Sequence, residues 1–171
     1  MRKFKKVSKK QYLTGFYDAI LDMCEFTEDS VYVKDYEDIK LPKRATRGSA
    51  GYDCFAPFDI ALEPGDDIKV PTGIKCFMED DDVLLAFPRS GLGFKFRLQL
   101  NNTVGIIDSD YYYSSNEGHI FAKITNDTNE DRVVSIKKNT GFIQGIFLEY
   151  GITYDDEVSE IRDGGFGSTT K

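Results

Sequence analysis

The sequence lacks long apolar segments. None of its apolar runs approaches the roughly 20 residues that a helix needs to cross a bilayer. The first ten residues, MRKFKKVSKK, lead into polar residues where a secretory signal would be apolar. We therefore expect a soluble, cytoplasmic protein with no membrane partner.

Cysteine is scarce, and so is positive charge. Cys24, Cys54 and Cys76 are an odd number, widely spaced, and no histidine stands at a metal-ligand separation from them. Disulfides and structural zinc are therefore not expected. The chain has 22 Lys and Arg against 29 Asp and Glu, a net charge of -7. Nucleic-acid phosphates require a basic face, so no nucleic-acid partner is expected.

The 171 residues suffice for one domain with a sizeable core and are too few for two. The first segment has a helical pattern. Ser8 with Gln11 three residues later forms a capping box, and we expect the helix to pack on the main domain or a second subunit. Its apolar face is predicted from residues that recur at helical spacing, which are Leu13, Phe16, Tyr17, Ile20 and Cys24.

From about residue 32 the pattern changes to short β-type segments. The predicted strands cover residues 68–70, 73–77, 83–87, 94–100, 120–124, 133–136 and 142–150. Turn signals separate them, as at residues 63–66, 126–129 and 137–140. Such strands indicate an all-β sandwich, barrel or jelly roll. The acidic run 79–82 is interpreted as a solvated hairpin loop.

Three segments carry chemistry beyond the needs of folding. Residues 88–93 (Pro-Arg-Ser-Gly-Leu-Gly) offer backbone N–H groups, a hydroxyl and a guanidinium, the donors that a phosphate chain needs. Residues 105–111 place Asp108 after an apolar pair, where a carboxylate is either a general base or a turn former. The last ten residues combine Arg162, Phe166 and a Gly-Ser-Thr run, a composition typical of a mobile lid.

In this order, the segments resemble the five motifs of the trimeric dUTPase family. The motifs correspond to residues 49–53 (Ser-Ala-Gly-Tyr-Asp), 88–91, 105–111, 142–144 (Phe-Ile-Gln), and Arg162 with 164–169. The resemblance covers roughly residues 40–171. It implies a homotrimer with shared active sites. The implied fold is an all-β, dUTPase-like jelly-roll or β-barrel domain at residues 32–161, with an added N-terminal helix in residues 1–31 and a mobile, substrate-closing tail at 162–171.

The resemblance further implies hydrolysis of dUTP to dUMP and pyrophosphate, which lowers dUTP and supplies dUMP for thymidylate synthesis. Asp108 would activate the water that attacks the α-phosphorus. Mg²⁺ would bridge the phosphates and touch the protein only through a water held by Asp53, in keeping with the ion's preference for phosphate oxygens and water.

The other site residues follow from the same resemblance. Tyr111 is assigned to the deoxyribose, where its ring would leave no room for a 2′-hydroxyl. Phe166, beside Gly167 in the tail, would stack on the base. The phosphate chain is assigned to Arg89, Ser90, Gly91, Gln144, Arg162, Ser168 and Thr169. Uracil is assigned to a hairpin that includes Asn102, Gly105, Ile106, Ile107 and Phe121.

Two stretches depart from the family pattern. Residues 139–141 (Asn-Thr-Gly) stand where the fourth motif usually has Gly-Asp-Arg. Residues 112–117 intervene before Gly118 and lengthen the tip of the hairpin. The single histidine, His119, has no place in this chemistry and is interpreted as a structural or surface residue.

Two other functions remain open. A dCTP deaminase shares the fold and the triphosphate site but activates water with a glutamate; residues 108–111 favour the diphosphatase, and no glutamate is obviously placed for deamination. A nucleotide-gated regulatory role, in which the protein docks onto an unidentified protein partner, would be additional to catalysis. The N-terminal helix and the lengthened hairpin are the features that would serve it.

Overall fold

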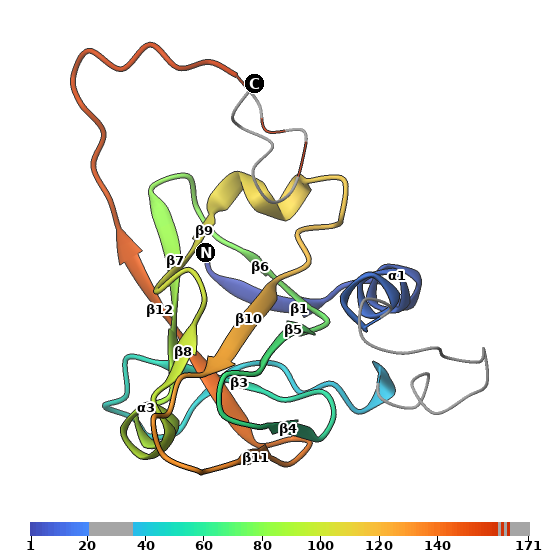
Figure 1. The fold of residues 1–171 in the computed structure, drawn as a ribbon. Coiled ribbons are helices and arrows are strands. Elements are labelled where there is room, and N and C mark those ends of the chain that lie inside the picture. Colours follow the sequence, from blue (N-terminus) through green and yellow to red (C-terminus); the bar gives the residue numbers. More distant parts are fainter. Residues whose placement is uncertain (21–35, 161, 163, 165–171) are drawn as a thin grey trace.

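The computed structural model describes residues 1–20, 36–160, 162 and 164. Antiparallel strands dominate these residues (Figure 1). The elements are β1 Lys3–Lys6, α1 Lys9–Ile20, β2 Lys43–Arg44, β3 Tyr52–Phe55, β4 Ile60–Leu62, β5 Asp67–Pro71, β6 Ile74–Phe77, β7 Asp82–Pro88, α3 Ser90–Phe96, β8 Leu98–Leu100, β9 Gly105–Asp108, the 3-10 helix η1 Ser109–Tyr113, β10 Phe121–Asn126, β11 Val134–Ile136 and β12 Gly141–Glu149.

The largest sheet has the order β2-β3-β12-β7-β9, and a second sheet has the order β5-β10-β8. Buried and less buried positions alternate along β7 and β10, because successive side chains of a strand point to opposite faces. The buried side chains of both sheets join one apolar core. The expected all-β domain with an N-terminal helix is confirmed, and no helix among the described residues is long and apolar enough to span a bilayer.

The N-terminal segment is built into this core. The Oγ of Ser8 accepts a hydrogen bond from the backbone N–H of Gln11 at 3.1 Å, so the predicted helix start is confirmed. Tyr12 and Phe16 are buried, whereas Tyr17 is 42% exposed and was wrongly placed on the apolar face. Cys24 lies outside the described residues.

Strand β1 was not predicted, because Lys3–Lys6 contains a single apolar residue. It forms by pairing antiparallel with β6, from Lys3 opposite Phe77 to Lys6 opposite Ile74. Strand β1 thus depends on pairing with a strand far away in the sequence. Residues 1–20 are consequently part of the folded domain and share its sheets and core.

The strand predicted at residues 94–100 is wrong in its first half. Residues 94–96 complete helix α3, which ends at Arg97 in the left-handed conformation with φ 52°. Strand β8 begins only at Leu98. The aromatic residues Phe94 and Phe96 favour strands by propensity, but the turn made by residues 89–93 starts a helix.

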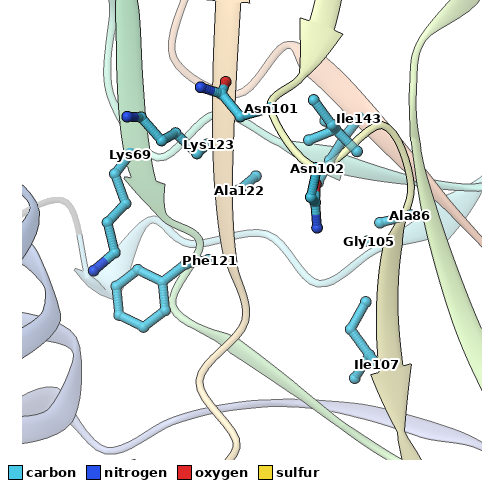
Figure 2. A pocket seen from close by; sticks show the side chains of 11 residues that line it. Lys69, Ala86, Asn101, Asn102, Gly105, Ile107, Phe121, Ala122, Lys123 and Ile143 are labelled. Atoms are coloured by element: carbon cyan, nitrogen blue, oxygen red, sulfur yellow. The ribbon is translucent and has the colours of Figure 1, made fainter. Parts of the chain in front are cut away.

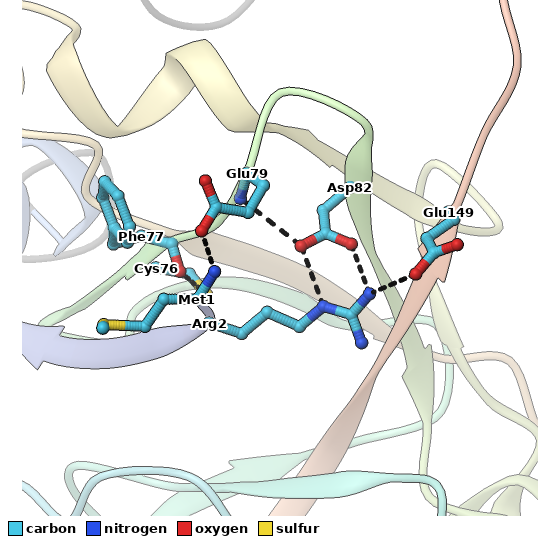
Figure 3. A network of polar contacts seen from close by, with 7 residues as sticks. All are labelled: Met1, Arg2, Cys76, Phe77, Glu79, Asp82 and Glu149. Carbon is cyan, nitrogen blue, oxygen red and sulfur yellow. Dashed lines mark hydrogen bonds and ion pairs between the residues drawn. The ribbon is translucent and has the colours of Figure 1, made fainter.

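The interpretation of residues 79–82 as a solvated hairpin loop is confirmed for the exposure of residues 79–81, but it is wrong for the hairpin and for Asp82. Strand β6 pairs with β1, and β7 pairs with β12 and β9, so this turn connects two sheets. The Asp82 side chain is only 3% exposed and accepts a hydrogen bond from Arg2 Nε at 2.8 Å. Figure 3 shows Arg2 reaching both Asp82 and Glu149. A buried carboxylate requires such a partner.

Candidate functional site

A cavity of about 180 Å³ lies beside β9 and η1. Its lining residues are Asn102, Gly105, Ile106, Ile107, Asp108, Tyr111, Ile120, Phe121 and Arg162. All but Ile120 are residues that the sequence predicted for the site. Ile120 directly precedes Phe121 on the return strand assigned to uracil. The predicted hairpin is wrong as a paired unit, because β9 pairs with β7 whereas β10 pairs with β5 and β8.

A larger cavity of about 430 Å³ shares Asn102, Gly105, Ile107 and Phe121 with the first (Figure 2). Lys69 and Lys123, on β5 and β10, line it as well. The Lys69 ammonium lies 4.6 Å from the centre of the Phe121 ring. Sequence reasoning missed both lysines, because lysine is ordinary on the outward face of a strand.

Asp108 ends strand β9 and is half-buried. The Arg162 guanidinium is ion-paired with Asp108 and lies 3.0 Å from Asp110 Oδ1. It also lies 5.8 Å from the centre of the Tyr111 ring. The arginine of the fifth motif therefore meets the third motif within one chain. Phe166, Gly167, Ser168 and Thr169 lie outside the described residues.

Tyr111 is buried, with 8% of its surface exposed, and burial raises the pKa of its hydroxyl. His119 is fully buried, and its Nε2 accepts a hydrogen bond from the backbone N–H of Gly73 at 2.9 Å. Burial lowers the pKa of His119 to about 3, so the ring is neutral at physiological pH. Of the two interpretations of this histidine, the structural one is confirmed.

The remaining predicted residues form a second group around β3, β12 and the junction of β7 with α3. Arg89 Nε lies 3.2 Å from Asp53 Oδ1. Gln144 stands opposite Asp53 in the sheet and donates from Nε2 to the carbonyl oxygen of Pro88 at 3.2 Å. Ser90 begins helix α3, whose first backbone N–H groups have no partner inside the helix. These groups suit an anionic ligand.

Two glycines make this second group possible. A Cβ at Gly51 would lie 2.5 Å from Gln144 Oε1, and a Cβ at Gly141 would lie 2.9 Å from Arg89 Nη1. Any larger residue would displace these side chains. Gly141 belongs to the stretch that departs from the usual fourth motif, yet it leaves room for the arginine of the second.

The two groups lie at opposite ends of β7. Asp108 pairs with Val83 near the start of that strand, and Arg89 follows its last residue. Six residues of extended chain span about 20 Å. Figure 1 agrees, because α3 and the yellow helix that follows β9 lie at opposite ends of the molecule. One chain therefore does not bring Asp108 and Arg89 to the same phosphate.

The described carboxylates suit a metal ion that takes few ligands from the protein. No cluster of three or more His, Cys, Asp or Glu side chains able to hold a metal occurs within the part of the chain that the structure describes. Asp53 stands as a single carboxylate beside Arg89. This arrangement fits a magnesium ion that is bound mainly by phosphate oxygens and water.

Comparisons with known proteins agree with these motifs. The dUTPase family model matches residues 37–170. Over 134 residues the chain is 42% identical to the deoxyuridine 5′-triphosphate nucleotidohydrolase of Lactococcus lactis subsp. lactis (strain IL1403), which covers 77% of this chain and 88% of that protein.

Solved structures show the same fold. The dUTPase from Streptococcus mutans matches with a TM-score of 0.63 and 32% identity, covering 88% of this chain and 97% of that one. A mutant dUTPase from phage phi11 of S. aureus, which coordinates a structural Mg(II) ion, matches with a TM-score of 0.62 and 17% identity, covering 94% and 97%. Together, the family model and the sequence identity show that the chain belongs to the dUTPase family.

Proposed function

We propose that this chain hydrolyses dUTP to dUMP and pyrophosphate. The observation that carries the proposal is the position of Asp108, a carboxylate in the wall of the cavity that is also lined by Tyr111 and the residues assigned to uracil. Family membership supports the same reaction. Asp108 is also the one acidic residue among the described lining residues, so a deaminase mechanism finds no glutamate there.

In this proposal Asp108 takes a proton from water as that water attacks the α-phosphorus. A positioned general base contributes about 10²–10⁴ in rate. The bond from the α-phosphorus to the bridging oxygen breaks, and pyrophosphate leaves. The chemistry that Mg²⁺ supplies is neutralisation of the phosphate oxygens, with Asp53 as the residue that would hold one of its waters.

The same cavity would also select the nucleoside in this proposal. The buried Tyr111 ring would lie under the deoxyribose and occupy the space of a 2′-hydroxyl. Backbone groups around Gly105 and Ile106 would recognise the uracil edge. A cytosine would leave a buried donor or acceptor without a partner, which costs about 1–3 kcal/mol per group.

We further propose that the complete site is shared between copies of the chain in a homotrimer. The separation of about 20 Å between Asp108 and Arg89 supports this, because reacting groups must approach to about 3 Å. Arg89, Ser90, Gly91 and Gln144 of one copy would bind the phosphates of a nucleotide held in the cavity of another. The tail that follows Arg162 would then close over the γ-phosphate.

The reaction is tested by incubating the purified protein and Mg²⁺ with dUTP or dCTP, while pyrophosphate and ammonia are measured. Pyrophosphate from dUTP alone is the expected result. Ammonia from dCTP would instead identify a deaminase and overturn the proposal.

The proposal that each active site is shared between two copies of the chain is tested by mixing two inactive variants. Asp108→Asn and Arg89→Ala should each be inactive alone. Unfolding the two variants together and refolding the mixture should restore activity, since about a quarter of the sites would combine an intact Asp108 with an intact Arg89 from a different copy. Two wild-type preparations that are treated identically give the reference. A refolded mixture without activity would show that each chain carries its own site.

A further inference from the structure

The N-terminal segment and the insertion after the third motif meet in the folded protein. The segment precedes the matched residues 37–170, and the insertion covers residues 112–117. Glu117 Oε2 accepts a hydrogen bond from the backbone N–H of Ser8 at 2.8 Å, and Oε1 accepts one from its hydroxyl at 2.5 Å. The contact joins the start of helix α1 to the loop between η1 and β10.

The insertion also holds the side chain of Tyr111. Asn116 Nδ2 donates a hydrogen bond to the Tyr111 hydroxyl oxygen at 2.8 Å, and the hydroxyl donates to the carbonyl oxygen of His119 at 2.7 Å. The hydroxyl group thus accepts one hydrogen bond and donates another. Both hydrogen bonds meet at the hydroxyl oxygen, which lies on the long axis of the rigid ring, so they fix the tip of the ring and the direction of that axis.

Asn116 is itself held in place by its neighbours. Its Oδ1 accepts a hydrogen bond from the backbone N–H of Gly118 at 3.1 Å and lies 2.7 Å from the Ser114 hydroxyl. Gly118 has φ 69°, and a Cβ there would lie 2.8 Å from the Tyr111 carbonyl oxygen, so only glycine allows this close return.

Glu117 supplies the link to the rest of the fold. Its φ of 59° places a non-glycine residue in the left-handed region, which persists only where the surroundings hold it. The hydrogen bond from Ser8 is the main cause that lowers the pKa of this carboxyl, and Lys75 lies 3.6 Å away on the other side. Asn116 is therefore carried on a backbone that helix α1 and strand β6 both fasten.

We propose that Asn116 is a positioning residue for sugar selection: through its hydrogen bond it fixes the Tyr111 ring against the place of the 2′-hydroxyl. The proposal rests on the proposed function of Tyr111. The carbonyl of His119 holds the same hydroxyl from the opposite side, and the Ser8–Glu117 contact keeps the insertion in position. A ring freed at its tip would tilt, and the ribose hydroxyl would then fit beside it.

The test compares kcat/KM for UTP and dUTP in the full-length protein. Asn116→Ala removes the donor, Tyr111→Phe removes the hydroxyl but keeps the ring, and the double variant removes both. We expect Asn116→Ala to raise the UTP/dUTP ratio about three- to tenfold, the effect of one hydrogen bond. Tyr111→Phe also loses the bond to the His119 carbonyl and should raise the ratio at least as much. The double variant should show no larger increase than Tyr111→Phe, because without the hydroxyl Asn116 has no group to hold. Asn129→Ala, in the exposed turn between β10 and β11, is the matched control.

The thermal unfolding midpoint of each variant separates positioning from stability, since a merely structural role would lower the midpoint and leave the ratio unchanged. Should Asn116→Ala fail to fold, Asn116→Asp takes its place, because it keeps the size and the Oδ1 acceptor but loses the Nδ2 donor. A wild-type ratio in Tyr111→Phe, or additive effects in the double variant, would overturn the proposal.

Tyr111→Ala distinguishes a failure of the positioning role of Asn116 from a failure of the sugar-selecting role of Tyr111. If it changes the UTP/dUTP ratio while Asn116→Ala does not, the positioning role of Asn116 is wrong and the role of Tyr111 stands. If Tyr111→Ala leaves the ratio unchanged, the assignment of Tyr111 to sugar selection fails, and the role of Asn116 fails with it.

Discussion

The guanidinium of Arg162 forms an ion pair with the carboxylate of Asp108 in the same chain. The proposed γ-phosphate ligand and the proposed general base thus hold one another. A triphosphate carries more negative charge than one carboxylate, so it would compete for this guanidinium. We therefore expect substrate binding to release Asp108 from this ion pair.

Replacing Asp108 should separate chemistry from binding. Asp108→Asn keeps the shape of the side chain but cannot accept the proton of the attacking water, so we expect kcat to fall by at least about 10²–10⁴. Affinity for dUTP, measured by calorimetry, should stay within a few-fold of the wild type. Asp110→Asn removes the other carboxylate beside Arg162 and serves as the control. Near-normal pyrophosphate release by Asp108→Asn would remove this residue from its role.

Removing the Tyr111 ring should relax sugar selection. In Tyr111→Ala the space proposed to exclude the 2′-hydroxyl opens, so the ratio of kcat/KM for UTP to that for dUTP should rise by about tenfold or more. Tyr113→Ala is a matched control, because Tyr113 lies on the same 3-10 helix and is 71% exposed. Equal ratios in the two variants would place sugar selection elsewhere.

Deleting residues 162–171 should abolish turnover without unfolding the protein. The deletion removes Arg162 and the residues assigned to the closing tail, while the buried core lies entirely in earlier residues. We expect normal assembly by light scattering and a fall in kcat of about 10³ or more, as for other catalytic arginines. Arg162→Ala in the full chain shows how much of the loss is due to the guanidinium. If the truncated protein is folded and fully active, the proposed closing role of residues 162–171 is wrong.

Acidification should destabilise the protein through His119. The pKa of the buried ring is about 3, below the value of about 6.5 in an unfolded chain. Between these values the unfolded chain binds a proton that the folded chain does not, so stability falls as the pH drops.

This single histidine should cost about 2 kcal/mol of unfolding free energy between pH 7 and pH 5, measured by urea unfolding. His119→Gln keeps an acceptor for the Gly73 N–H and should lose most of that dependence. If the unfolding free energy of both proteins depends equally on pH, the dependence does not come from His119.

Local sequence was enough to predict the chemistry and many of the elements. The donors of residues 88–91 and the carboxylate in 105–111 are recognisable by residue type and order alone. Ser8 predicted the start of α1, because capping acts within a few residues. The short apolar run at residues 83–87 predicted β7 for a similar reason, since a run of this length and composition is a local signal for a buried strand.

The tertiary structure decided what depends on residues far apart in the chain. Strand β1 exists because β6 lies beside it, and Asp82 is buried because Arg2 reaches it from the N-terminus. Spacing along the sequence places Asp108 nineteen residues after Arg89 but says nothing of their distance in space. Only the antiparallel pairing of β7 with β9 places them at opposite ends of a strand, because sheet register is set by the packing of the whole chain.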